Sequence, residues 1–161
     1  MRELRTEIDI DAPAERVWEC LTDLASFPKW NPFIRSIRGP LVVGSRLDVL
    51  LGASGTKPMA FRPTVRRVVP NRELRWLGRV GIPRLFDGEH IFELSPLGPD
   101  RVRFVQREIF RGLLVPFLAK SLDRDARRGF EEMNRALRDR VTGAAEPPGG
   151  GAIPDAGERR S

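Results

Sequence analysis

Three polar residues fall at alternate positions in two otherwise apolar segments, and they are the residues of this chain best suited to chemistry. They are His90 in the first segment, and Gln106 and Glu108 in the second. Both segments alternate like β-strands, in which even-numbered residues share one face. A hairpin that turns at residues 97–101 places His90 opposite Glu108. The same register places Phe92 opposite Gln106, so three polar side chains are predicted to enter one apolar interior.

A histidine beside a glutamate in such an interior has three interpretations. The pair forms a polar floor that orients a ligand, it acts as an acid and base on an enolisable ligand, or it is a cross-strand hydrogen-bonded pair that fixes the register. If the protein is an enzyme, His90 and Glu108 are the catalytic candidates. Because His90 is the only histidine and the sequence identifies no third partner for it, a role without catalysis is favoured.

Other kinds of catalytic or cofactor site are not indicated. The chain has no G-x-S-x-G, P-loop or G-x-G-x-x-G motif. One histidine and one cysteine are too few for a conventional zinc site. Cys20 is expected to be a small buried residue of the first helix rather than a nucleophile. We therefore expect no metal and no cofactor.

The positive charge of the chain is almost entirely arginine. The net charge is +6, and only Lys29, Lys57 and Lys120 among the 28 basic residues are lysines. The arginines are interleaved with Asp and Glu and accompany no nucleic-acid-binding motif, so we expect no nucleic-acid partner. Transient contact with an anionic membrane surface is a minor alternative. Docking of an arginine-rich surface on a protein partner is another.

Length and hydropathy predict one domain, and the single cysteine, which cannot form a disulfide within the chain, favours the cytoplasm. The 161 residues, of which 40% are hydrophobic, are enough for one domain with a real core. No apolar run has the length of a signal peptide or of a membrane-spanning helix. The sequence leaves open whether the protein is a monomer or a homodimer.

The longest regular pattern is helical and covers residues 116–141, where apolar side chains recur every three or four positions. A helix of this length extends for about 39 Å, so a large apolar surface must cover its stripe. We expect a curved sheet around it, with the functional site between the two, near Phe130 and Met133. The residues of the stripe are Leu118, Leu122, Ala126, Phe130, Met133, Leu137 and Val141.

The chain before this helix is predicted to be mainly strands. Alternation at residues 3–10 predicts the first strand, and an Asp-Ala-Pro-Ala-Glu sequence at 11–15 predicts the start of a helix. Two prolines and an asparagine within residues 27–33 end that helix. Short strands separated by polar turns then indicate an antiparallel meander. The predicted strands are residues 34–38, 46–51, 60–69, 73–79, 90–94 and 101–110.

Three stretches carry a resemblance to a known superfamily. They are Ile-Asp-Ala-Pro at 10–13 with Val17 and Trp18, Trp-Asn-Pro-Phe at 30–33, and Glu-His-x-Phe-x-Leu at 89–94 followed by Gln-x-Glu-x-Phe-x-Gly-Leu-Leu at 106–114. With the order of elements, these stretches make residues 1–141 similar to the SRPBCC superfamily, also called START-like or birch-pollen-allergen-like. Within it, the chain resembles the polyketide cyclase/dehydrase-like branch.

The resemblance implies an α+β helix-grip fold, in which a curved antiparallel β-sheet wraps around a long C-terminal α-helix, with one or two short helices after the first strand. The domain is expected at residues 1–141, and the Gly/Pro-rich composition of residues 142–161 predicts a disordered tail. The resemblance also implies a cavity for a hydrophobic molecule. It implies no single chemistry, because the superfamily includes lipid carriers, hormone receptors, quinone binders and cyclases. The absence of tyrosine weakens the cyclase alternative.

We therefore expect a carrier or sensor of a small hydrophobic ligand, such as a lipid, a quinone, or a polyketide-like, aromatic or isoprenoid molecule. A cyclase, dehydratase or isomerase is the alternative. Two apolar segments, residues 81–88 and 112–117, are unusual for loops and are predicted to form the entrance. The entrance residues are Ile82, Leu85, Phe86, Leu114 and Phe117. The predicted ligand contacts, for which core packing is the competing explanation, are Trp30, Phe61, Trp76, His90, Phe92, Phe104, Gln106, Glu108, Phe130 and Met133.

Overall fold

Eight strands and a long C-terminal helix make up the fold in a computed structural model, which describes residues 1–52, 55, 57–80, 84–117 and 122–143. The strands are β1 (Arg2–Ile10), β2 (Ile34–Arg38), β3 (Asp48–Leu51), β4 (Met59–Phe61), β5 (Thr64–Val69), β6 (Glu73–Val80), β7 (Phe86–Gly98) and β8 (Arg101–Arg111). The helices are α1 (Ala14–Thr22), a 3₁₀ turn (Leu24–Ser26), α2 (Phe27–Trp30), a π-helical turn (Leu122–Ala126) and α4 (Arg127–Thr142).

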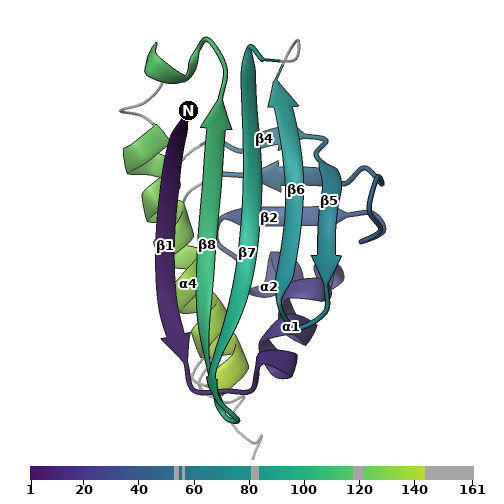
Figure 1. The fold of residues 1–161 in the computed structure, drawn as a ribbon, viewed down its shortest axis with the longest axis vertical. Coiled ribbons are helices and arrows are strands. Elements are labelled where there is room, and N and C mark those ends of the chain that lie inside the picture. Colours follow the sequence, from purple (N-terminus) through teal and green to yellow (C-terminus); the bar gives the residue numbers. More distant parts are fainter. Residues whose placement is uncertain (53–54, 56, 81–83, 118–121, 144–161) are drawn as a thin grey trace, which may run out of the picture.

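The strands form two antiparallel sheets that enclose the core together with α4 (Figure 1). The larger sheet has the order β1-β8-β7-β6-β5, and the smaller has the order β2-β3-β4. In Figure 1, α4 lies behind β1 and β8, and the smaller sheet runs crosswise behind β6 and β5. This is an α+β fold with a curved antiparallel sheet around a long C-terminal helix, as the sequence predicted.

The register of β7 and β8 agrees with the prediction from strand parity. His90 pairs with Glu108, and Phe92 pairs with Gln106. The even-numbered residues face the helix, because alternating side chains of a strand point to opposite faces of the sheet. β7 is longer than predicted, since it begins at Phe86 inside the segment expected to be a loop. Its first residues pair with both β6 and β8.

The predicted single strand at residues 60–69 was wrong, because two strands occupy it. β4 pairs with β3, whereas β5 pairs with β6. Pro63 lies between them and has no amide hydrogen to donate to a ladder. Its carbonyl instead accepts a hydrogen bond from the backbone of Leu47. The chain thereby passes from the smaller sheet to the larger one at this proline.

The C-terminal helix keeps its predicted apolar stripe but not its predicted regularity. Phe130, Met133, Leu137 and Val141 are all buried on α4. The five residues before α4 form a wider π-helical turn rather than α-helix. Residues 118–121 of the predicted helix and residues 144–161 of the predicted tail lie outside the described residues. Gly143 has a φ of 77°, a left-handed conformation that commonly ends a helix at glycine.

Gly129 is a point of close approach between α4 and the segment that follows α2. A Cβ atom at this position would clash with Cδ2 of Phe33. The Phe33 ring is itself held edge-on against Phe130, with ring centroids 5.4 Å apart. A side chain at residue 129 therefore has to displace an aromatic ring that is packed in the core.

Gly129→Ala is expected to lower the free energy of unfolding by about 1–2 kcal/mol, because the overpacking exceeds the helix propensity that alanine gains over glycine. Urea denaturation followed by tryptophan fluorescence measures this loss. Adding Phe33→Leu should recover part of it, since the smaller side chain leaves room for a methyl group. Equal stability of Gly129→Ala and the unchanged protein would contradict this packing.

Candidate functional site

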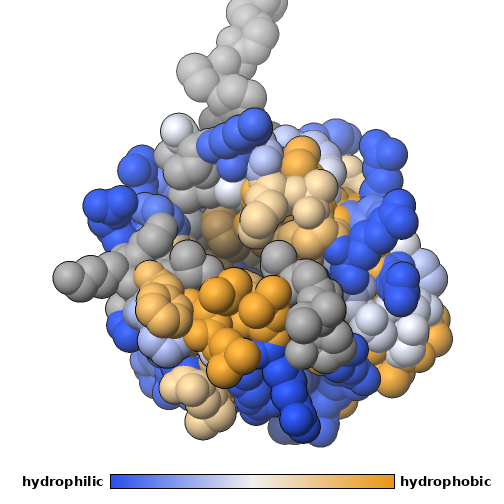
Figure 2. All heavy atoms as spheres, turned by 90° about the horizontal axis from the view of Figure 1, so that it is seen from above, coloured by the Kyte–Doolittle hydropathy of each residue, from blue (hydrophilic) through white to orange (hydrophobic). Residues whose placement is uncertain are grey.

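A pocket of about 120 Å³ lies between α4 and the two sheets. It is near the end of the molecule at the top of Figure 1, and the view from that end shows a hollow with apolar side chains gathered around it (Figure 2). The lining residues are almost all apolar. They are Phe33, Leu51, Met59, Phe61, Gly78, Arg79, Phe86, Gly88, Glu108, Phe110, Ala126 and Phe130.

Two paired glycines leave space for the pocket. Gly78 on β6 is the register partner of Gly88 on β7. Both glycines are at even-numbered positions, on the same inner face of the sheet as His90. A Cβ on Gly78 would lie 3.1 Å from Cε2 of Phe61, and one on Gly88 would lie 2.5 Å from Oε1 of Glu108. Because neither residue has a side chain, Phe61 and Glu108 lie over bare backbone. The pocket therefore depends on two adjacent positions of the sheet that lack a Cβ.

Glu108 is the acidic residue of this lining, and a short hydrogen-bond chain holds its carboxylate. Its Oε2 lies 2.6 Å from Nδ1 of His90. On the other side of the ring, His90 Nε2 lies 3.1 Å from Nε2 of Gln106. With Nδ1–H donating to the carboxylate, Nε2 accepts a hydrogen from the Gln106 amide. Both imidazole nitrogens are thus engaged within the protein.

His90 lies in an aromatic cage rather than in the lining of the pocket. Its side chain is only 4% exposed. The ring stacks on Trp76 with centroids 5.2 Å apart and an interplanar angle of 17°. Phe92 and Phe130 contact it edge-on. These contacts fix the orientation of the imidazole and, through it, that of the Glu108 carboxylate.

Asn31 positions the aromatic wall opposite the sheet. Its Oδ1 accepts backbone hydrogen bonds from Phe33 at 3.0 Å and from Ile34 at 2.8 Å. This side-chain turn directs the chain out of α2 and into β2. Phe33 consequently reaches the pocket, where its ring meets Phe130. The Trp-Asn-Pro-Phe motif therefore contributes to the pocket through its last residue.

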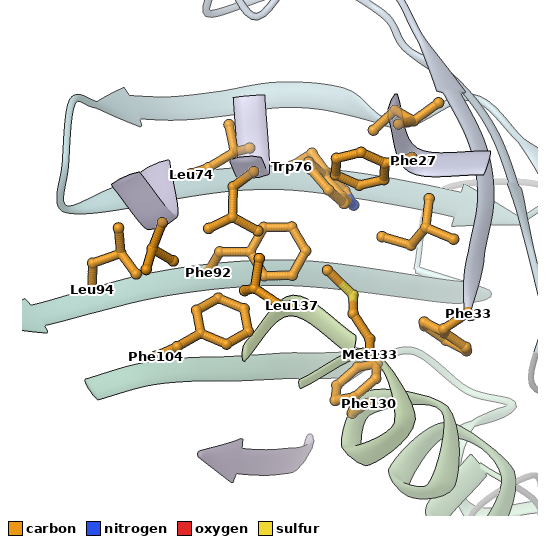
Figure 3. Packing of buried hydrophobic residues seen from close by; sticks show 14 of the residues in the cluster. Phe27, Phe33, Leu74, Trp76, Phe92, Leu94, Phe104, Phe130, Met133 and Leu137 are labelled. Carbon is orange, nitrogen blue, oxygen red and sulfur yellow. The ribbon is translucent and has the colours of Figure 1, made fainter. Parts of the chain in front are cut away.

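The structure separates the predicted ligand contacts into two groups. Phe61, Glu108 and Phe130 line the pocket. The others lie in the packed interior or next to it, and part of this packing is seen in Figure 3. A contact between these others and a ligand stays a prediction. They are Trp30, which packs on Phe27, and Trp76, His90, Phe92, Phe104, Gln106 and Met133, which are buried.

Several lining residues were not among the predicted contacts. Parity could have identified three of them, since Gly78, Gly88 and Phe110 lie on the same inward face as Trp76 and His90. Ala126 belongs to the predicted apolar stripe and Phe33 to the Trp-Asn-Pro-Phe motif, but neither was predicted to contact a ligand. The sequence holds no comparable signal for the residues contributed by the smaller sheet, which are Leu51 and Met59.

The two apolar segments predicted to form the entrance lie side by side. The amides of Leu113 and Leu114 donate to the carbonyls of Arg84 and Leu85, each at 3.1 Å. Phe86 lines the pocket, while Phe117 is 84% exposed and Leu113 is 77% exposed. Ile82 lies outside the described residues. Exposed apolar side chains thus accumulate at the same end of the molecule as the pocket.

The outward face of the larger sheet carries ion pairs between arginines and acids. Arg103 donates to Asp9 at 2.7 Å, and Arg107 donates to Glu3 at 2.7 Å and to Glu93 at 2.9 Å. The hydrogen bond from Arg103 lowers the pKa of Asp9. A lowered carboxyl pKa contributes stability above the ordinary pKa of the group, and this contribution is lost as the pH falls. Many charges of this face therefore neutralise one another across strands.

Cys20 is a poor nucleophile in the folded protein. Burial raises the pKa of its thiol from 9.0 to about 11, so that about one thiol in a thousand is ionised at pH 8. In the unfolded chain, where the pKa is close to 9.0, about one in ten is ionised. Cys20 was expected to be buried; it is only partly buried, but it packs against the core.

Thiol labelling with a disulfide reagent at pH 8 is expected to be about 100-fold slower in the folded protein than in urea, and to accelerate about tenfold per pH unit up to about pH 11. Because the unfolded thiol ionises first, stability should also decline between about pH 9 and 11. Fast labelling of the folded protein at pH 8 would show that Cys20 is not buried in this way.

Two absences apply to the part of the chain that the structure describes. Within it, no helix is long and apolar enough to cross a membrane. The described residues also contain no group of three or more His, Cys, Asp or Glu side chains placed to hold a metal ion.

Comparisons with known proteins identify the family. A family model described as "Polyketide cyclase / dehydrase and lipid transport" matches residues 1–142. No curated protein sequence matches the chain at a significant level. Solved structures with a similar fold include TTHA0849 from Thermus thermophilus, which is 22% identical, with a TM-score of 0.70 over 90% of this chain and 100% of that one.

Two further structures extend the comparison. A START superfamily protein from Mycobacterium smegmatis is 24% identical, with a TM-score of 0.68 over 89% of this chain and 99% of that one. The Zhui aromatase/cyclase from a Streptomyces species is 14% identical, with a TM-score of 0.72 over 90% and 96% of the two chains. At such identities the likeness shows the fold alone. The match of the family model over nearly all of the described residues, on the fold that its sequence motifs implied, makes this chain a member of the polyketide cyclase/dehydrase and lipid transport family.

Proposed function

We propose that this protein binds a small hydrophobic molecule in the pocket beneath Phe61 and Phe130, and acts as its carrier or sensor. The observation that carries the proposal is the composition of the lining, in which Glu108 and Arg79 are the only charged residues and the other side chains are aromatic or aliphatic. Small-molecule sites are typically apolar concavities with few convergent polar groups. The family description, which includes lipid transport, supports the same class of function.

Ligand binding to the pocket is testable by thermal stability. A ligand that binds only the folded state raises the melting temperature. A panel of small lipids, quinones and aromatic molecules should therefore contain compounds that raise it. Native mass spectrometry of protein purified from its own host should in addition detect a bound mass. If no compound raises the melting temperature and no mass co-purifies, the binding proposal is wrong.

A pocket-filling variant assigns the binding to this site. Ala126→Leu places three additional carbon atoms at the pocket wall and should abolish the ligand-induced shift. Ala136→Leu makes the same chemical change on α4 at a position outside the lining, and should leave the shift intact. Equal effects of the two substitutions would place the ligand elsewhere.

An acid–base enzyme of the cyclase, dehydratase or isomerase type is the second candidate. It is favoured by one observation, the 2.6 Å contact between His90 and a carboxylate that lines the pocket. In this mechanism Glu108 contacts the ligand and His90 acts through it, because both imidazole nitrogens already have partners. His90→Ala and Glu108→Gln should each lower turnover of a substrate at least 100-fold. Unchanged turnover in both variants would exclude this mechanism.

We propose that the exposed apolar residues at the entrance contact an anionic membrane, and that the ligand passes between the membrane and the pocket there. Arg84 and Arg111 flank Leu113 there and are exposed, and basic residues contribute about 1 kcal/mol each to binding near an anionic surface. Phe117→Asp should reduce co-sedimentation with phosphatidylserine vesicles at low salt at least fivefold. Val43→Asp, at an exposed apolar residue (62%) in a turn beside β5, is the control and should have little effect. If the unchanged protein does not bind the vesicles, it does not exchange its ligand with a membrane through this surface.

A further inference from the structure

The carboxylate of Glu108 presents one of its two oxygens to the pocket. Oε2 is occupied by His90, whereas Oε1 is the atom that lies over Gly88. Among the described residues, Oε1 has no hydrogen-bond donor. A carboxylate accepts several hydrogen bonds. The Glu108 side chain is 16% exposed, and a ligand that fills the pocket but offers Oε1 no donor would leave this acceptor unsatisfied, which is unfavourable. The pocket therefore has an unused acceptor of fixed orientation.

Gly88 is required for this arrangement. A Cβ at residue 88 would lie 2.5 Å from Oε1, so any other amino acid would push the carboxylate away from its position. Arg79 is the other residue of the lining that has a hydrogen-bonding side chain. It is at an odd-numbered position of β6, so its side chain points to the outer face of the sheet, where its Nε lies 3.9 Å from Asp87. The side chains of the lining consequently offer a ligand one acceptor and no comparable donor.

The size of the pocket limits what reaches that acceptor. Its volume of about 120 Å³ is close to that of an engineered apolar cavity of about 150 Å³ that binds benzene. The part of the ligand that the pocket encloses, between Phe61 and Phe130, is therefore about one ring in size. Any longer portion has to extend toward the entrance.

The number of donors decides between a hydroxyl and an ammonium group. An ammonium has three N–H donors, while a hydroxyl has one. A primary ammonium would be attracted by the charge of Glu108, but with a single acceptor oxygen available it would leave two donors unsatisfied in an apolar site, and this cost opposes the attraction. A carboxylate ligand would be repelled by Glu108. A neutral hydroxyl satisfies the free oxygen without leaving a buried donor unpaired.

We propose, building on the pocket as the binding site, that its ligand is a ring-sized apolar group bearing one hydroxyl, which donates a hydrogen bond to Oε1 of Glu108. In this arrangement His90 is a positioning residue that directs Oε1 toward the ligand, and Gly88 is the residue that leaves the carboxylate accessible. Specificity then comes from the unpaired acceptor, because a ligand without a hydroxyl leaves it unsatisfied.

A matched pair of compounds tests this proposal in the unchanged protein. Toluene and p-cresol have the same ring and methyl group and differ by one hydroxyl. Calorimetric titration should show p-cresol binding about 10- to 100-fold more tightly than toluene, the factor expected for a hydrogen bond to a charged group. Hydrophobicity alone would make toluene bind more tightly. Tighter binding of p-cresol therefore requires the hydrogen bond to Glu108. In Glu108→Met the preference should reverse, since the acceptor is gone.

Two further variants make the result specific. Glu89→Gln removes a carboxylate from an outward-facing position on β7 and should leave the preference for p-cresol unchanged. Gly88→Ala displaces the acceptor and should reduce the preference at least tenfold. If both compounds bind the unchanged protein and p-cresol binds no more tightly, the hydroxyl proposal is overturned while the pocket stands as a binding site. If neither compound binds at its solubility limit, the binding proposal fails as well.

Discussion

Phe92→Ala is expected to lower the free energy of unfolding by about 3–5 kcal/mol, the range for truncating a buried aromatic residue. Phe92 is 1% exposed. Its ring contacts His90, Trp76 and Phe104, with centroid distances of 4.5, 5.1 and 5.6 Å. These neighbours are held by other core residues, so the space left by the ring does not collapse. Guanidinium denaturation followed by tryptophan fluorescence measures the change.

Phe61→Ala is the matched comparison, because it truncates the same side chain at the pocket wall. Phe61 is half-buried and lies over Gly78. Its loss should cost about 1 kcal/mol of stability, because folding buries little of the apolar surface of Phe61. The same substitution should weaken ligand binding. If Phe92→Ala instead left stability within about 1 kcal/mol and weakened binding, the interior around Phe92 would be a ligand chamber and not solid core.

Most elements of this fold, and the register of β7 and β8, follow from local patterns. Alternation predicts which faces of β7 and β8 are buried, and the position of the turn between them fixes which residues pair. His90 and Glu108 were therefore predictable as neighbours from the sequence. The apolar stripe of α4 was predictable for the same reason, since helical periodicity is a property of residues close in the chain.

The location of the pocket was not predictable in this way, because it depends on how much volume facing elements contribute. Trp76 and Phe92 fill the space beside His90, whereas Gly78 and Gly88 leave it empty only a short distance along the same strands. Residues of the smaller sheet complete the wall, and their approach depends on the break at Pro63. Sequence parity identifies the inward face, but not which part of it is hollow.

His90 is also the residue whose loss should most disturb the polar part of the site. Replacing it with leucine leaves the Glu108 carboxylate without its donor at 2.6 Å. The Gln106 amide also loses its acceptor on the ring. The Glu108 side chain is 16% exposed, so water offsets part of the loss. We expect His90→Leu to lower the free energy of unfolding by about 3 kcal/mol, near the low end for breaking a buried pair.

A double-mutant cycle separates the pair from the packing of the imidazole. His90→Leu combined with Glu108→Met removes the unpaired charge and should recover about 1–2 kcal/mol relative to His90→Leu alone, since the coupled residues are not additive. Denaturation of the four proteins in the same buffer measures the coupling. If the pair only fixes the register of β7 and β8, this coupling is present and ligand affinity is unchanged in His90→Gln. If His90 positions Oε1 for a ligand, the coupling is accompanied by a loss of the preference for a hydroxyl. An additive cycle would mean that the two side chains are adjacent without stabilising each other. The carboxylate, which lines an open pocket, would then exchange its imidazole partner for water at no cost in free energy.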